Sequence, residues 1–189
     1  MKKLVLKRPI DIGIENWKNR LYRSKECNVE RRLIQLKTIA VEKKKIGGLK
    51  MNQDIIGKAE AIIAKNTGIG TYCVLSLIDL DGYPIASTIT ASKAEGINWL
   101  TFCTGLGGTR TNRIDKCNRA SVCFNSDDYN ITLVGTIEIL TDPAVKKEMW
   151  YEGLENHFSG PEDPNYCVLR FKTERYNLFV DWKEVRGRL

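Results

Sequence analysis

Short β-rich runs bounded by turn residues follow one another along the chain from residue 70 onward, and this pattern restricts the folds it can adopt. Residues 70–80 and 85–92 flank a turn that contains Asp81-Gly82, and Asp-Gly between two β-rich runs is a strong hairpin signal. The other strand-like runs cover residues 96–104, 120–128, 129–140 and 166–180, the last supplying one or two closing strands. Six or so short strands with few helices predict a mainly β fold, a closed or nearly closed antiparallel barrel.

Three segments predict helices around these strands. Residues 51–68 carry apolar side chains at the spacing of an amphipathic helix. A second helix is expected over residues 109–119. A third is expected over residues 142–158, because Asp142 opens it and Pro143 suits the first helical position.

The net charge of +7 is unevenly distributed. Residues 1–50 hold 15 Lys and Arg against 5 Asp and Glu, whereas residues 51–189 hold 15 against 18. The spacing of apolar residues in this basic leader, residues 1–50, predicts a helix from about residue 28 to residue 45. The leader has three interpretations: an arm that binds nucleic acid, a helix that packs on a partner subunit, or translated upstream sequence.

The third interpretation depends on Gly47-Gly48. If these codons read GGA-GGA, they form the core of a bacterial ribosome-binding site at a short spacing before the codon of Met51. Under this hypothesis Met51 is the true start and residues 51–189 are the folded domain. The nucleotide sequence tests it, because codons that form no purine-rich site would contradict it.

The six cysteines form no CxxC pair and the chain has a single histidine, His157, so no metal site is expected. Several cysteines lie in apolar runs, which favours free structural thiols over disulfides. No apolar run approaches the roughly 18 residues needed to span a bilayer. The first apolar run breaks at Lys7, Arg8 and Pro9, too early for a signal peptide, so we expect a cytoplasmic protein without a membrane partner.

The segment NWLTFCTGLGGTRTNRI, residues 98–114, joins a strand-like run to an expected helix through a glycine-rich loop. Its spacing is neither GxxxxGK[ST] nor GxGxxG within a βαβ unit. Glycines expose backbone N–H groups, hydroxyls donate, an arginine adds a charged fork, and a helix N-terminus follows. The residues concerned are Thr104, Gly105, Gly107, Gly108, Thr109 and Arg110. The loop is therefore a candidate phosphate site, and a solvated loop with an incidental arginine is the alternative.

The order of parts from residue 51 to about residue 182 resembles the pyridoxamine 5′-phosphate oxidase-like superfamily of split-barrel flavin-binding proteins. Within it, the chain resembles the branch related to general stress protein 26. The resemblance is carried by DGYPIASTIT, WLTFCTGLGGTRTNRI, NRASVCF, YNITLVGTIEIL and PEDPNYCVLRF. It implies a six-stranded antiparallel split β-barrel and a homodimer with FMN at the interface. Deazaflavin and haem are less favoured cofactors for the same fold.

The resemblance also implies which residues hold the cofactor. In the family, two strands, the glycine-rich loop and a polar side chain opening a later long strand surround the flavin and its phosphate. These positions are Ser87, Thr88, Ile89, Thr90, Ser92, Cys103, Thr104, Thr109, Arg110 and Asn130. Family members carry Arg or Lys at the position of Ser87 and Ser-Arg-Lys or Ser-Lys at residues 108–110, so this chain offers fewer basic groups.

No arrangement of residues in the sequence indicates a catalyst made of protein side chains alone, and a bound flavin would itself transfer the hydride and electrons. True pyridoxamine phosphate oxidases use a C-terminal motif with Arg and His, whereas the tail NLFVDWKEVRGRL has no histidine, so oxidation of vitamin B6 is not expected. We expect an FMN-dependent oxidoreductase acting on an unidentified small-molecule redox substrate. The alternatives are a non-catalytic flavin-binding stress protein and a nucleic-acid-binding protein acting through the leader, which the acidic remainder of the chain argues against.

Overall fold

The computed structural model describes residues 35–39, 41–42 and 47–189. The chain divides into two units, Met1–Lys50 and Met51–Leu189. All described residues of the first unit are helical. The remainder of the helix expected over residues 28–45 lies outside the described residues. None of the helices in the described ranges is both long enough and apolar enough to cross a membrane.

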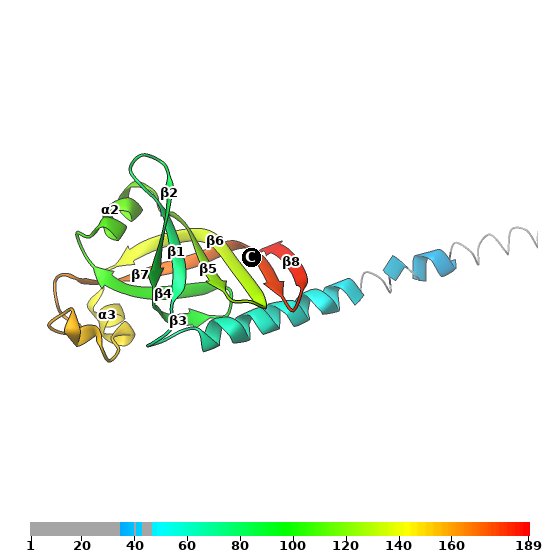
Figure 1. Cartoon of the computed structure of the whole chain (residues 1–189), viewed down its shortest axis with the longest axis horizontal. Helices are drawn as coiled ribbons and strands as arrows, with labels where there is room; N and C mark the ends of the chain where they lie inside the picture. Colours follow the sequence, from blue (N-terminus) through cyan, green and yellow to red (C-terminus); the bar gives the residue numbers. More distant parts are fainter. Residues whose placement is uncertain (1–34, 40, 43–46) are drawn as a thin grey trace, which may run out of the picture. The chain divides into compact units, whose positions relative to one another are not determined.

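The second unit opens with a helix over residues 51–65, as the amphipathic spacing predicts, and continues mainly with strands (Figure 1). Its strands are β1 (Cys73–Ile78), β2 (Pro84–Ile89), β3 (Ala91–Glu95), β4 (Trp99–Gly105), β5 (Arg119–Asn125), β6 (Tyr129–Leu140), β7 (Tyr166–Val180) and β8 (Lys183–Arg188). The later helices are α2 (Thr109–Lys116), α3 (Pro143–Met149) and the short 3₁₀ helix η1 (Leu154–Asn156). Figure 1 shows α2 and α3 at the same end of this unit.

The described strands form one antiparallel sheet in the order β2-β1-β5-β6-β7-β4-β3, with β8 paired to β7. Thr90 alone joins β2 to β3, the two ends of this order, so the sheet curls until its ends meet. The hydroxyl of Thr90 donates to the carbonyl of Thr71 at 3.1 Å and fixes this corner. The result is the mainly β, antiparallel split barrel that the sequence predicts.

The expected count of six strands is wrong, because the described residues form eight. The β-rich run 85–92 divides at Thr90, where the chain leaves one edge of the sheet and enters the other. The second difference is β8, which follows a tight turn after β7. Asp181 and Trp182 form that turn with φ angles of 51° and 62°. Because neither residue is a glycine, the sequence contains no signal for this left-handed turn.

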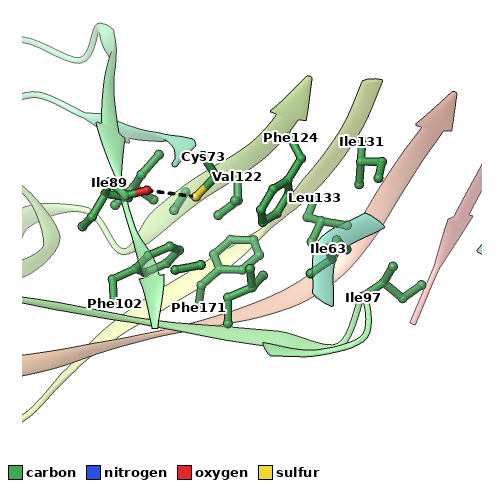
Figure 2. Packing of buried hydrophobic residues seen from close by; sticks show 14 of the residues in the cluster. Ile63, Cys73, Ile89, Ile97, Phe102, Val122, Phe124, Ile131, Leu133 and Phe171 are labelled. Carbon is green, nitrogen blue, oxygen red and sulfur yellow. Dashed lines mark hydrogen bonds between the residues drawn. The ribbon is translucent and has the colours of Figure 1, made fainter. Parts of the chain in front are cut away.

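One hydrophobic core fills the curled sheet and takes in the helix 51–65. Alternate residues of β1 are buried, as expected for a strand with one face on a core. Figure 2 shows Ile89, Phe102, Val122, Phe124 and Phe171 converging from four different strands. Each large side chain buried in this way stabilises the fold by about 1.5–3 kcal/mol.

The cysteine thiols of the described residues are free, in agreement with the expectation of structural cysteines. Cys73 lies in the core, where its Sγ donates to the carbonyl of Ile89 at 3.4 Å (Figure 2). Burial is the main cause that raises the pKa of Cys73 to about 12. The Cys73 thiol therefore stays protonated at neutral pH and acts as a small core residue.

The helix expected over residues 142–158 begins as predicted and ends earlier. The carboxylate of Asp142 accepts the backbone N–H groups of Ala144 and Val145 at 2.9 and 3.1 Å and caps α3, with Pro143 in the first turn. The helix stops at Met149, where the expectation of a longer helix is wrong. Gly153 has a φ of 97°, so the chain turns and forms the separate helix η1 instead.

The longest strand, β7, connects the parts of the sheet. β6 pairs with β7 from Val180 back to Val168, while β4 pairs with its first part and β8 with its last part. The β6–β7 register shifts at Gly135, where a Cβ atom would lie 1.9 Å from the carbonyl oxygen of Lys172. Only glycine fits this bulge, because the two backbones approach too closely for a side chain.

Candidate functional site

The glycine-rich loop connects the end of β4 to the start of α2. Gly107 turns the chain with a φ of 70°, and Gly108 is the N-cap of α2. The N–H of Leu106 donates to the carbonyl of Asn165 at 2.6 Å and anchors the loop to the segment before β7. No side chain caps α2, so the backbone N–H groups of its first turn stay available to an anion.

Arg110 lies in that first turn and its guanidinium reaches across to β2. Its Nε and Nη2 donate to the hydroxyl oxygen of Ser87 at 3.4 and 3.3 Å. Nη2 also donates to the carbonyl oxygen of Thr88 at 3.0 Å. A guanidinium carries five N–H donors, so these contacts orient the group and leave donors for a ligand.

A pocket of about 350 Å³ opens beside this arginine. Strand ends, the start of α2 and the segment after α3 all contribute to it. Its lining residues are Ile89, Thr90, Cys103, Thr104, Gly105, Arg110, Tyr151, Leu154, His157 and Phe158. The volume lies within the range of about 300–1,000 Å³ that is usual for small-molecule sites.

Cys103 lies where the pocket meets the interior. Its Sγ is 3.2 Å from the hydroxyl of the buried Tyr166 and donates to the carbonyl of Met149 at 3.5 Å. Burial raises the pKa of Cys103 and, more strongly, that of Tyr166, whose rise Cys103 increases. The thiol and the phenol therefore remain neutral at physiological pH, which makes Cys103 a poor nucleophile.

The pocket brings together five of the residues expected from the resemblance, namely Ile89, Thr90, Cys103, Thr104 and Arg110. Ser87 and Thr88 are joined to it through Arg110, and Thr109 is the first residue of α2.

Ser92 and Asn130 lie outside this group. The hydroxyl of Ser92 turns toward Thr101 and donates to its carbonyl at 3.0 Å. Asn130 opens β6, as expected, but its amide donates to Asn125 at 3.2 Å and accepts the hydroxyl of Thr132 at 3.1 Å. Asn130 does not line the pocket of its own chain.

The wall formed by residues 151–158 was not anticipated from the sequence. Tyr151, Leu154, His157 and Phe158 line the pocket because Gly153 and η1 bring them back toward β4. His157 is exposed and lines the pocket. Its being the single histidine of the chain was the one signal that could have drawn attention to it.

The site suits a phosphate group better than a metal ion. The uncapped N-terminus of α2 and the remaining N–H donors of the Arg110 guanidinium both favour a compact anion. Within the described ranges, no three His, Cys, Asp or Glu side chains lie close enough together to hold a metal ion.

Solved structures of similar fold include the protein related to general stress protein 26 from Clostridium acetobutylicum, with a TM-score of 0.63 and 24% identity over 72% of this chain and 95% of that chain. General stress protein 26 from Bacillus anthracis has a TM-score of 0.57 and 20% identity, covering 69% and 97% of the two chains. A heme-binding protein from Mycobacterium smegmatis has a TM-score of 0.55 and 16% identity, covering 69% and 57%. At these identities the likeness shows the fold.

No curated protein sequence matches the chain. The sequence profile of the pyridoxamine 5′-phosphate oxidase family matches residues 70–179, from the segment before β1 to the penultimate residue of β7. The matched segment therefore contains β1 to β6, β7 without its last residue, the glycine-rich loop and every residue that lines the pocket. Because it covers more than half of the sequence, the chain belongs to the pyridoxamine 5′-phosphate oxidase family.

Proposed function

We propose that the protein is an FMN-binding flavoprotein that holds the phosphate of the cofactor at the start of α2. The observation that carries the proposal is the position of Arg110, whose guanidinium lines the pocket from the first turn of an uncapped helix. The anion would gain from the helix dipole and from charge-assisted hydrogen bonds at the same point. Thr104 and Thr109 add hydroxyl groups nearby in the chain.

The remaining residues would position the cofactor and limit its contact with water. Ile89 and Leu154 give the pocket apolar walls, and the hydroxyl of Thr90 donates to the carbonyl of Thr71. When bound, FMN supplies hydride and single-electron transfer, so the protein needs to provide only position and electrostatics. A protonated Cys103 thiol agrees with this, because it leaves the redox chemistry to the cofactor.

The test compares FMN with riboflavin, which lacks the phosphate, by absorbance and fluorescence titration of the full chain. We expect FMN to bind at least about tenfold more tightly, since hydrogen bonds to a charged group contribute about 1.5–3 kcal/mol each. Arg110→Gln should remove this preference and leave riboflavin binding unchanged. Arg113→Gln, in the last turn of the same helix, is the matched control and should keep the preference. Equal affinity of the wild-type chain for the two flavins would overturn the phosphate assignment.

Within this proposal the protein with bound FMN is a small oxidoreductase, and its unidentified redox substrate is not a B6 vitamer. The non-catalytic alternative predicts FMN that binds and is not reduced by NADH or NADPH. Anaerobic bleaching of the flavin absorbance by either nucleotide favours the enzyme. Bound flavin that stays oxidised with both nucleotides favours the storage or sensing role.

We also propose that the protein works as a homodimer in which a second chain covers the open side of the pocket. β2 ends the strand order, and an edge strand offers unpaired backbone groups to another chain. Tyr83 and Ile85, which lie at and just after the β1–β2 turn, are exposed apolar side chains that such a contact would bury. Sedimentation of the full chain tests this, and Ile85→Glu should shift a dimer toward the monomer. A wild-type chain that sediments as a monomer with FMN bound would contradict it.

Haem is the second candidate ligand, and the position of His157 favours it. His157 and Arg110 line the same pocket, so the imidazole would bind the haem iron and the guanidinium would pair with a propionate. The similarity to a heme-binding protein supports the test. Haem titration should give a sharp Soret band that His157→Ala abolishes. A Soret change that persists in that variant would exclude His157 as the ligand.

A further inference from the structure

The part of the pocket lined by residues 151–158 is aromatic and packs on buried rings. Phe158 packs against Tyr166 with ring centroids 5.2 Å apart, and Trp150 meets the same ring edge-on at 5.3 Å. Tyr166 is fully buried, so Phe158 packs against a side chain of the protein interior. Tyr151 and Phe158 thus present apolar rings to the pocket, and planar rings stack favourably on such surfaces.

Backbone hydrogen bonds fix the position of His157, whereas its imidazole is left to interact with a ligand. The N–H groups of His157 and Phe158 both donate to the carbonyl of Leu154 at 2.9 Å, which closes the η1 turn. Glu155 accepts the N–H of Gly153 at 2.8 Å at the start of the same turn. Within the described ranges the imidazole of His157 forms no hydrogen bond, and its ring contact is with Phe158.

Among the residues that the structure describes, no aspartate or glutamate lines this pocket. Burial raises the pKa of Tyr151, which keeps its phenol a neutral hydrogen-bond donor. The described side chains that line the pocket therefore carry no carboxylate, and Arg110, Tyr151 and His157 can each donate a hydrogen bond to a ligand oxygen. A cationic ligand would meet no carboxylate to offset the loss of its hydration.

We propose that Tyr151, His157 and Phe158 form a subsite for the substrate, and that it takes a planar aromatic ring bearing an oxygen acceptor such as a carboxylate or carbonyl. His157 is the residue that selects the oxygen substituent, and Phe158 is the surface on which the ring lies. The inference rests on the proposed flavin function, because the same pocket would place this ring beside the cofactor held by Arg110.

The test uses the single histidine as a reporter. In the full chain, labelled at histidine and freed of any affinity tag, NMR shows one set of imidazole resonances, which belongs to His157. Benzoate is the probe, benzamidine is its cationic counterpart, and acetate lacks the ring. We expect a saturable shift of the resonances with benzoate and none with benzamidine or acetate at equal concentration. No shift with benzoate, or an equal shift with benzamidine, would overturn the proposal.

Two variants separate the subsite from the overall fold, with benzoate affinity measured by calorimetry. His157→Ala removes an exposed side chain and should weaken binding at least about tenfold, in line with the loss of one hydrogen bond to a charged group. Phe158→Leu should weaken it by about two- to tenfold, the contribution of an aromatic pair. Phe179→Leu, at a half-buried phenylalanine on β7, is the matched control and should leave the affinity unchanged. Unchanged benzoate affinity in His157→Ala would contradict the selecting role.

Repeating the benzoate titration with FMN present tests the subsite and the FMN site separately. Benzoate binding without any FMN binding would keep the subsite and reject the flavin. FMN binding with no response of His157 to benzoate would keep the flavin and reject the subsite.

Discussion

Arg110 donates a hydrogen bond from Nη2 to the carbonyl oxygen of Thr88 at 3.0 Å, across 22 positions of the sequence. This contact ties the first turn of α2 to β2 and fixes the direction of the guanidinium. The backbone oxygen that accepts it cannot be removed by a side-chain substitution. The arginine is therefore held in place before any ligand arrives, which reduces the entropy lost on binding.

Introducing a basic residue at Ser87 should strengthen FMN binding. Ser87 accepts hydrogen bonds from Arg110 at 3.3 and 3.4 Å, and the resemblance described above implies Arg or Lys at this position. Ser87→Lys places a second cation at the phosphate cradle, so we expect the FMN Kd to fall about tenfold, with riboflavin unaffected. Ser76→Lys, at a half-buried serine of β1, should leave both affinities unchanged. Weaker FMN binding in Ser87→Lys would place the phosphate elsewhere.

Gly135→Ala should strongly destabilise the sheet. The new Cβ atom would meet the backbone oxygen of Lys172 at 1.9 Å, and a backbone atom cannot move away as a flexible side chain can. We expect the free energy of unfolding to fall by about 3 kcal/mol, the upper end of overpacking penalties, in urea denaturation. Gly57→Ala is the control, because its Cβ meets nothing within 4 Å on a helix and should stabilise by up to about 1 kcal/mol. A loss below about 1 kcal/mol for Gly135→Ala would show that the bulge can relax.

Trp182→Gly should stabilise the β7–β8 turn. Trp182 has a φ of 62° and is 83% exposed, so it bears a left-handed conformation and buries little surface in return. Glycine removes a penalty of about 1–2 kcal/mol for that conformation, and we expect the melting temperature to rise by a few degrees. Trp182→Ala keeps the penalty and loses the edge-on contact with Phe179, so it should not stabilise. Equal melting temperatures for the two variants would contradict the role of backbone strain.

Acid should destabilise the loop before β7 through Asp163. Its carboxylate accepts the backbone N–H groups of Ser159 and Asn165 at 2.8 Å each, and these bonds lower the pKa of Asp163 below its usual 3.8. A lowered folded-state pKa means that the stabilisation is complete above the unfolded-state value and is lost as the pH falls through the folded-state value. We expect the melting temperature of the wild type to fall more steeply than that of Asp163→Asn as the pH falls below 3.8. Asp127→Asn, at an exposed aspartate, should follow the wild type.

The hairpin, the amphipathic helix and the start of α3 could be predicted because their signals are local. Asp81-Gly82 does form the β1–β2 turn, with Gly82 at a φ of 89°. Asp142 does cap α3. Each of these features depends on the backbone preferences of a few consecutive residues.

The features that were missed depend on tertiary structure. Thr90 has no turn chemistry of its own, and it becomes a corner because β2 and β3 pair with different strands. The Asp181-Trp182 turn contains no glycine, and its φ angles are imposed by the pairing of β7 with β8. His157 reaches the pocket only through the turn at Gly153, so no sequence spacing links it to Arg110.

The pairing of β7 with β4 also bears on the order in which the chain folds. β5–β6 and β7–β8 are hairpins between neighbouring strands, whereas Thr104 and Cys167, which pair across β4 and β7, are 63 residues apart. Closing so long a loop costs more entropy than closing a hairpin, so β4 is expected to dock after the hairpins have formed. Cys103, Thr104 and Gly105 belong to β4, and the pocket therefore comes into existence with that late step. A molecule that fills the pocket would act on folding kinetics mainly by slowing the departure of β4 from an already assembled sheet.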